Sequence, residues 1–204
     1  MPQYIAFLRA INVGGRFIKM ATLAEHFRSL GHSDVSTYIN SGNVIFHSGS
    51  KSPERLAAAL EAGLAPLMGF ETSAFLRSVP QLGAVVERAA AFKAAVPAGG
   101  DLNVAFLKAP LDEAQQAALQ LLRSDIDDFA HAGQELFWIC RRKQSDSKFS
   151  NAVLERKLRL VTTFRRVSML ETLAAERNSR PMPPSRRIAG PKGVPASRPQ
   201  RANR

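Results

Sequence analysis

Two short apolar runs of strand type lie about 98 residues apart in the chain, at 4–8 and at 102–107. A basic residue follows each run, Arg9 in the first copy and Lys108 in the second. A turn and an amphipathic pattern come next in both copies. Apolar residues at helical spacing predict one helix over 20–30 and a second one from an Asp112 cap to residue 122.

Each copy continues with two strands separated by a turn. The alternation predicts strands at 35–40 and 43–47 in the first copy, and at 128–131 and 135–140 in the second. A helix follows, begun by Ser52-Pro53 in one copy and by Ser147 or Ser150 in the other. Pro66 is expected to end or kink the first of these helices.

Both copies close with a strand that runs into a helix. The predicted ranges are 72–77 then 80–90, and 161–166 then 168–176, the last helix opening with Ser168 and Glu171 at capping-box spacing. Each half therefore reads β-α-β-β-α-β with one helix appended, which is the ferredoxin-like order. The predicted fold class is α+β, with two similar ferredoxin-like halves in tandem. A single mixed sheet without duplication is the alternative.

The predicted domains are a first half at 1–95, a second half at 96–178 and a tail at 179–204. Lys and Arg outnumber Asp and Glu by 9 to 6 in the first half, 12 to 11 in the second and 7 to 0 in the tail. Six of the twelve prolines also fall in the tail, which predicts a disordered basic segment. Such a segment contacts phosphate backbones or serves only as a solubilising extension.

Several classes of function are disfavoured by composition. No stretch is long and apolar enough to cross a bilayer, and the first residues lack a basic region followed by an apolar core, so we expect a cytoplasmic protein. Cys140 is the only cysteine, and the four histidines lack metal-ligand spacing, so no metal or cofactor is expected. No catalytic constellation is recognisable, and whether the chain is an enzyme stays open.

Two polar segments, 8–20 and 38–46, are candidates for a ligand site. In the first, adjacent glycines let backbone N–H groups converge beside basic side chains at the start of a helix, which suits an anion. In the second, an Asn-Ser-Gly-Asn cluster interrupts two apolar strands. A turn alone would also explain either segment. The candidate ligand-binding residues are Arg9, Asn12, Gly14, Gly15, Lys19, Ser41, Asn43 and Lys148.

The same segments resemble a bacterial family called domain of unknown function 1697. Its members show Leu-Arg-Gly-Ile-Asn-Val-Gly-Gly and Tyr-Ile-Gln-Ser-Gly-Asn-Val, where this chain has Ala10 and Asn40 in place of the glycine and the glutamine. The similarity covers about 3–176 and implies an α+β fold and a cytoplasmic bacterial protein, without implying an activity. One departure is the segment 164–168, where members carry Arg-Asn-Trp-x-Thr. A site that drew polar groups from that run would be altered or lost here.

Three classes of function follow from these observations. The first is binding of a phosphorylated or carboxylated small molecule at the glycine-rich turn between strand and helix. The second is non-specific nucleic-acid binding through the tail and the region 141–166, which carries nine Lys and Arg against two Asp and Glu. The third is an interaction module without a small ligand. The sequence leaves the oligomeric state undetermined.

Overall fold

The computed structural model describes residues 1–12 and 17–179. Two four-stranded antiparallel sheets of the same topology account for its strands, with orders β2-β3-β1-β4 and β6-β7-β5-β8. The prediction of an α+β fold with two similar ferredoxin-like halves is confirmed, and the single mixed sheet is excluded. The predicted tail lies outside the described residues except for Ser179.

The first half has seven elements in the predicted order: β1 (Gln3–Leu8), α1 (Met20–Ser29), β2 (Ser33–Tyr38), β3 (Asn43–His47), α2 (Pro53–Met68), β4 (Ala74–Ser78) and α3 (Val79–Ala90). After a short 3₁₀ turn, η1 (Lys93–Ala95), the second half repeats them: β5 (Asp101–Phe106), α4 (Glu113–Gln120), β6 (Asp127–Ala132), β7 (Glu135–Cys140), η2 (Gln144–Asp146), α5 (Asn151–Leu158), β8 (Thr163–Arg166) and α6 (Val167–Ser179). Among the described helices, none is long and apolar enough to cross a membrane.

Helix starts follow the predicted caps in most places. Ser52, Asp112 and Ser150 each accept a backbone N–H at the start of α2, α4 and α5. Pro66 does not end α2, which continues to Met68, because the carbonyl that loses its helical partner belongs to the exposed Ala62 and is open to water.

The capping box predicted at Ser168 is wrong. Helix α6 begins at Val167, directly after β8, so Ser168 is already helical. Val167 is buried in the core between the sheets, and the helix starts at this residue, one position before the predicted start at Ser168. Glu171 instead forms an ion pair with Lys93.

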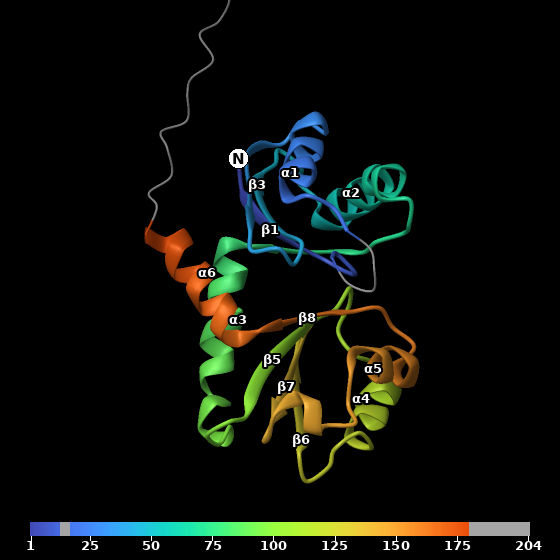
Figure 1. The fold of residues 1–204 in the computed structure, drawn as a ribbon, viewed down its shortest axis with the longest axis vertical. Helices are drawn as coiled ribbons and strands as arrows, with labels where there is room; N and C mark the ends of the chain where they lie inside the picture. Colours follow the sequence, from blue (N-terminus) through green and yellow to red (C-terminus); the bar gives the residue numbers. More distant parts are fainter. Residues whose placement is uncertain (13–16, 180–204) are drawn as a thin grey trace, which may run out of the picture.

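The two sheets pack face to face and share one apolar core. Figure 1 shows the two halves one above the other, with α3 and α6 crossing side by side along one flank. Alternate residues of β1 and β5 point into this shared core, and the rings of Phe7 and Phe106 stack at its centre with centroids 4.2 Å apart. Helices α1 and α2 cover the outer face of the first sheet, and α4 and α5 that of the second.

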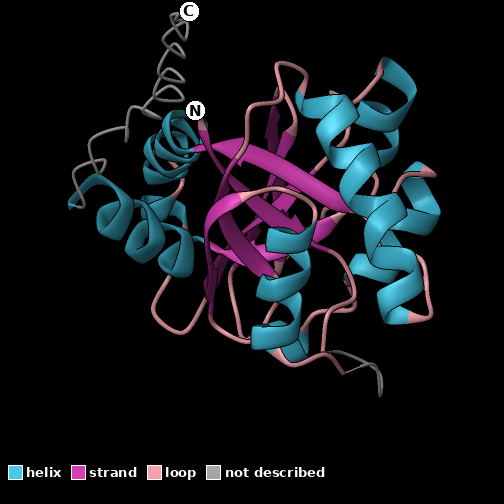
Figure 2. Cartoon of the chain, turned by 90° about the horizontal axis from the view of Figure 1, so that it is seen from above, coloured by secondary structure: helices cyan, strands magenta, loops and turns pink. Residues whose placement is uncertain are grey.

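Seen from above in Figure 2, the strands occupy the middle of the molecule and the helices surround them. The shared core changes from apolar to polar where β4 and β8 form the sheet edges. There Arg77 of β4 and Arg165 of β8, both buried, extend across to the opposite half. The junction between the halves is therefore the place where charged side chains are held away from water.

Candidate functional site

A cavity of about 410 Å³ lies at this junction, where the end of β1 meets β8 and the start of α5. Its polar wall is formed by Arg9, Ser41, Asn151, Thr163 and Arg165. Leu8, Ala10, Ile11 and Phe164 also line it, although the side chains of Leu8 and Ile11 pack into the core between the first sheet and its helices. We call this space the Arg165 cavity. It draws residues from both halves, so neither half alone forms it.

The loops beside the Arg165 cavity have unusual backbone conformations. Ala10, Asn12 and Ile39 have φ angles of 58°, 54° and 50°, in the left-handed region that favours glycine. Gly42 has φ 72°, and a Cβ there would lie 2.6 Å from Ile11 Cγ1, so no other residue fits without movement. Strain of this kind at a branched residue such as Ile39 is commonly found beside functional sites.

Arg165 is the central charged group of the cavity wall. Its Nε donates to Asn43 Oδ1 at 2.6 Å. Its Nη2 donates to the carbonyls of Leu8 and Ser41 at 3.0 and 2.8 Å. Its Nη1 donates to Thr163 Oγ1 and to the carbonyl of Phe164. All of these acceptors are neutral oxygens, and three of the five belong to the first half.

The charge of Arg165 is not balanced by an acid. Arg165 is only 9% exposed. Within the described residues no carboxylate lies at hydrogen-bond or ion-pair distance from its guanidinium. Burial lowers the pKa of Arg165 to about 10. Buried charges are ordinarily paired. Arg165 therefore leaves a positive potential on the cavity wall.

Arg9 forms the second basic part of the wall and is paired. Its Nε and Nη2 donate to both oxygens of Glu155 in α5, at 2.8 and 2.7 Å. The backbone N–H of Thr162 donates to the same carboxylate. The hydrogen bond to Glu155 raises the pKa of Arg9. Nη1 of Arg9 has no hydrogen-bond partner among the described residues, and Arg9 also lines a neighbouring cavity with Glu61 and Glu71.

We expect the Arg9–Glu155 pair to stabilise the fold at neutral pH and to lose this contribution at acid pH. Burial alone would raise the pKa of Glu155, but hydrogen bonds from Arg9 and Thr162 outweigh it and lower the pKa below its ordinary 4.5. The stabilisation by Glu155 is then complete above that ordinary value and is lost as the pH falls through the lower value of the folded state. Urea unfolding of the wild type and Glu155→Gln between about pH 6 and pH 3 should show a difference that shrinks with acidification. A difference in the free energy of unfolding that stays constant over this pH range would contradict the lowered pKa of Glu155.

Two hydroxyl groups complete the polar wall. Ser41 Oγ accepts from Asn43 Nδ2 at 2.9 Å, and Thr163 Oγ1 accepts from Arg165. In the described part of the chain neither hydroxyl hydrogen has an acceptor, so both can donate to an anion. Asn151 Oδ1 is buried without a hydrogen-bond partner there and can accept from a hydroxyl group of a ligand.

The structure brings together only part of the residue set predicted from the sequence. Arg9 and Ser41 line the Arg165 cavity, and Asn43 lies behind Ser41, fully buried. Asn12 does not line it; its side chain donates to the carbonyl of Asn40 and accepts from the N–H of Ile18. Lys19 is exposed, directly before α1.

Lys148 and the glycine pair lie elsewhere. Lys148 lines a separate cavity of about 500 Å³ beside β6, with Asp125 and Asp146. Gly14 and Gly15 lie outside the described residues. Of the described candidate residues, Asn12 and Lys148 therefore do not share the cavity that Arg9 and Ser41 line.

Sequence reasoning missed Arg165, Thr163 and Glu155. Arg165 falls in 164–168, the segment noted for departing from the family resemblance, so the departing segment supplies the central cation of the cavity. Its signal was present in the sequence as a basic pair in a short strand, Arg165-Arg166, where alternation predicts that one of the two points inward.

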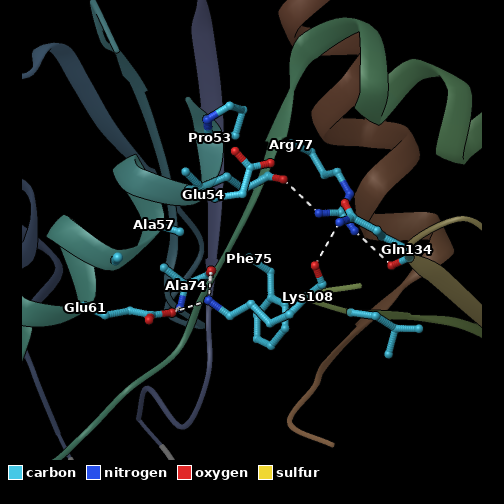
Figure 3. A pocket seen from close by; sticks show the side chains of 12 residues that line it. Pro53, Glu54, Ala57, Glu61, Ala74, Phe75, Arg77, Lys108 and Gln134 are labelled. Carbon is cyan, nitrogen blue, oxygen red and sulfur yellow. Dashed lines mark hydrogen bonds and ion pairs between the residues drawn. The ribbon is translucent and has the colours of Figure 1, made fainter. Parts of the chain in front are cut away.

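A second cavity, of about 300 Å³, occupies the corresponding place in the other half, and Figure 3 shows it at close range. Lys108 follows β5 as Arg9 follows β1, and it forms an ion pair with Glu61 of α2. Arg77 enters from β4 as Arg165 enters from β8. We call this space the Arg77 cavity. The repeat has therefore produced two similar cavities at one junction.

Comparison with known proteins gives a family and a similar structure. The model of a family described as "Protein of unknown function (DUF1697)" matches residues 1–137. The structure of the conserved bacterial protein SP0830 from Streptococcus pneumoniae is 26% identical to this chain, with a TM-score of 0.69 over 86% of this chain and 98% of that one. No curated protein matches at a significant level.

Proposed function

Since the chain belongs to the DUF1697 family, whose description names no ligand, we propose its function from the geometry of the junction: it binds a small organic anion, carboxylated or phosphorylated, in the Arg165 cavity. The buried, unbalanced charge of Arg165 is the observation that supports this proposal. An anion in the cavity offsets the cost of burying that charge.

The hydrogen bonds to the anion come from groups around Arg165. All five N–H groups of its guanidinium are already engaged, so Arg165 contributes charge. Arg9 Nη1 and the hydroxyls of Ser41 and Thr163 contribute the donors. Phe164, which is half-buried, supplies an apolar surface for the organic part of the ligand.

Anion-dependent thermal stabilisation tests this function. Sodium benzoate, sodium acetate and sodium phosphate, each at constant ionic strength, should raise the melting temperature of the wild type in at least one case. Arg9→Gln should abolish the increase, because it removes a donor and leaves Glu155 without its ion-pair partner beside the cavity. Lys19→Gln is the matched control, because it removes one positive charge from the exposed residue before α1.

The outcomes separate the cavity from the loop. A retained increase in Lys19→Gln and a lost one in Arg9→Gln support the Arg165 cavity. Loss of the increase in both variants would place the anion site at the glycine-rich loop predicted from the sequence and not in the Arg165 cavity. No increase with any of the three anions would overturn the proposed function.

A further inference from the structure

Asn43 and Glu135 occupy the same position in the two halves. Asn43 pairs with Phe7 in the first sheet, and Glu135 pairs with Phe106 in the second. Each is the first residue of its strand, directly after a turn. Each accepts a hydrogen bond from Nε of the arginine of the opposite half, at 2.6 Å from Arg165 and 2.7 Å from Arg77.

The two positions differ in charge. Glu135 gives Arg77 a carboxylate partner and also forms an ion pair with Arg88 at 3.2 Å. Asn43 gives Arg165 a neutral amide oxygen. The amide makes the same hydrogen bond as the carboxylate without cancelling the charge of the arginine. The repeat therefore contains one balanced arginine and one unbalanced arginine in matching surroundings.

Beside Arg77, the carboxylates of Glu135 and Glu54 equal in number the guanidinium groups of Arg77 and Arg88. Arg9 is paired with Glu155, and Lys108 is paired with Glu61. Arg165 is then the remaining unpaired charge of its cavity lining, and the deficit is a single negative charge. A singly charged ligand would complete the balance, whereas a doubly charged ligand would leave an excess negative charge in a partly buried place.

We propose that the ligand of the Arg165 cavity is an organic monocarboxylate. Asn43 determines this preference because it leaves Arg165 without an anionic partner from the chain. Beside Arg77, the carboxylate of Glu135 occupies the position that the ligand's carboxylate occupies beside Arg165. This inference rests on the proposed function. The half-buried side chain of Phe164 in the lining favours a hydrocarbon group next to the carboxylate. Glu135 closes the Arg77 cavity to anions by supplying the negative charge from within the chain.

Isothermal titration with sodium benzoate tests both positions. The wild type should bind one equivalent, and more tightly than it binds succinate or phosphate. Asn43→Asp places a carboxylate of the same shape beside Arg165 and should weaken benzoate binding at least about tenfold by supplying the charge internally. Glu135→Gln leaves Arg77 with a neutral partner and should raise the stoichiometry from about one equivalent to about two.

The results distinguish this inference from the proposed function. A wild type that binds none of these anions would overturn both. Benzoate binding that is unchanged by Asn43→Asp, a single equivalent in Glu135→Gln, or tighter binding of succinate or phosphate would overturn the monocarboxylate inference alone. Glu135→Gln should fold, because Arg165 is held by a neutral amide in the wild type. If Glu135→Gln does not fold, the effect of Asn43→Asp on benzoate affinity tests the inference.

Discussion

Phe106→Ala is expected to lower the free energy of unfolding by about 3–5 kcal/mol, the usual cost of truncating a fully buried phenylalanine. Phe106 has no exposed surface, and its ring stacks on Phe7 of the other sheet with an angle of 6° between the planes. The guanidinium of Arg77 lies 5.1 Å from the ring centroid. The substitution removes the central contact between the sheets together with this cation–π contact. Urea unfolding followed by circular dichroism measures the loss.

The control for Phe106→Ala is Phe17→Ala. Phe17 is 77% exposed, so its truncation should change stability by no more than about 0.5 kcal/mol. Because the two halves share the core around Phe106, they should also unfold in a single transition in both variants. A small effect of Phe106→Ala, or separate transitions of the two halves, would show that the sheets do not depend on this contact.

Much of the fold was predictable because strand alternation and helix caps are local signals. The runs beginning at Tyr4 and Leu102 lie 98 residues apart, and each lies in the strand expected for it. The packing of the two sheets on one another was not predictable, since Phe7 and Phe106 lie almost a hundred residues apart. Alternation alone does not determine whether the face of the strand that carries each ring is covered by another sheet or exposed to solvent.

The site was predictable in part, for the same physical reason. Arg9 and Ser41 lie in turns and Asn43 is the first residue of β3, at strand ends where polar residues interrupt apolar runs and are conspicuous. Arg165 lies within a strand and contacts Asn43 across 122 residues. Its importance depends on the absence of a carboxylate near it, which only the packed arrangement of the two halves determines.

The two cavities share a structural contact that does not depend on the charge balance. Each arginine fixes the carbonyl of a turn in the opposite half: Arg165 holds Ser41, and Arg77 holds Gln134 at 2.8 Å. Both contacts stabilise the junction whether or not the charge is balanced. Under the proposed function, a neutral residue at position 43 retains that role and adds the capacity to attract an anion, which Glu135 removes from the other half.

Glu135→Ala is expected to destabilise the protein by about 3–5 kcal/mol, because it leaves a buried arginine without its anion. The side chains of Arg77 and Glu135 are only 4% and 9% exposed, so water cannot replace the lost carboxylate. Arg88 loses the same partner and adds to the unbalanced positive charge. Urea unfolding at neutral pH measures the effect. Glu25→Ala, which breaks the exposed pair with Arg28, should cost no more than about 1 kcal/mol and serves as the control.

A second substitution separates the charge from the packing in this prediction. Adding Arg77→Met to Glu135→Leu replaces both charged groups by apolar side chains of similar volume, and it should recover most of the stability lost in Glu135→Ala. Recovery identifies the unpaired guanidinium as the source of the loss. A double variant as unstable as Glu135→Ala would instead show that the hydrogen bonds of Arg77 to Leu76 and Gln134, which the double variant removes, stabilise the protein as much as the charge balance does. The charge difference between Asn43 and Glu135 would then carry less weight than the bonds that the two arginines share.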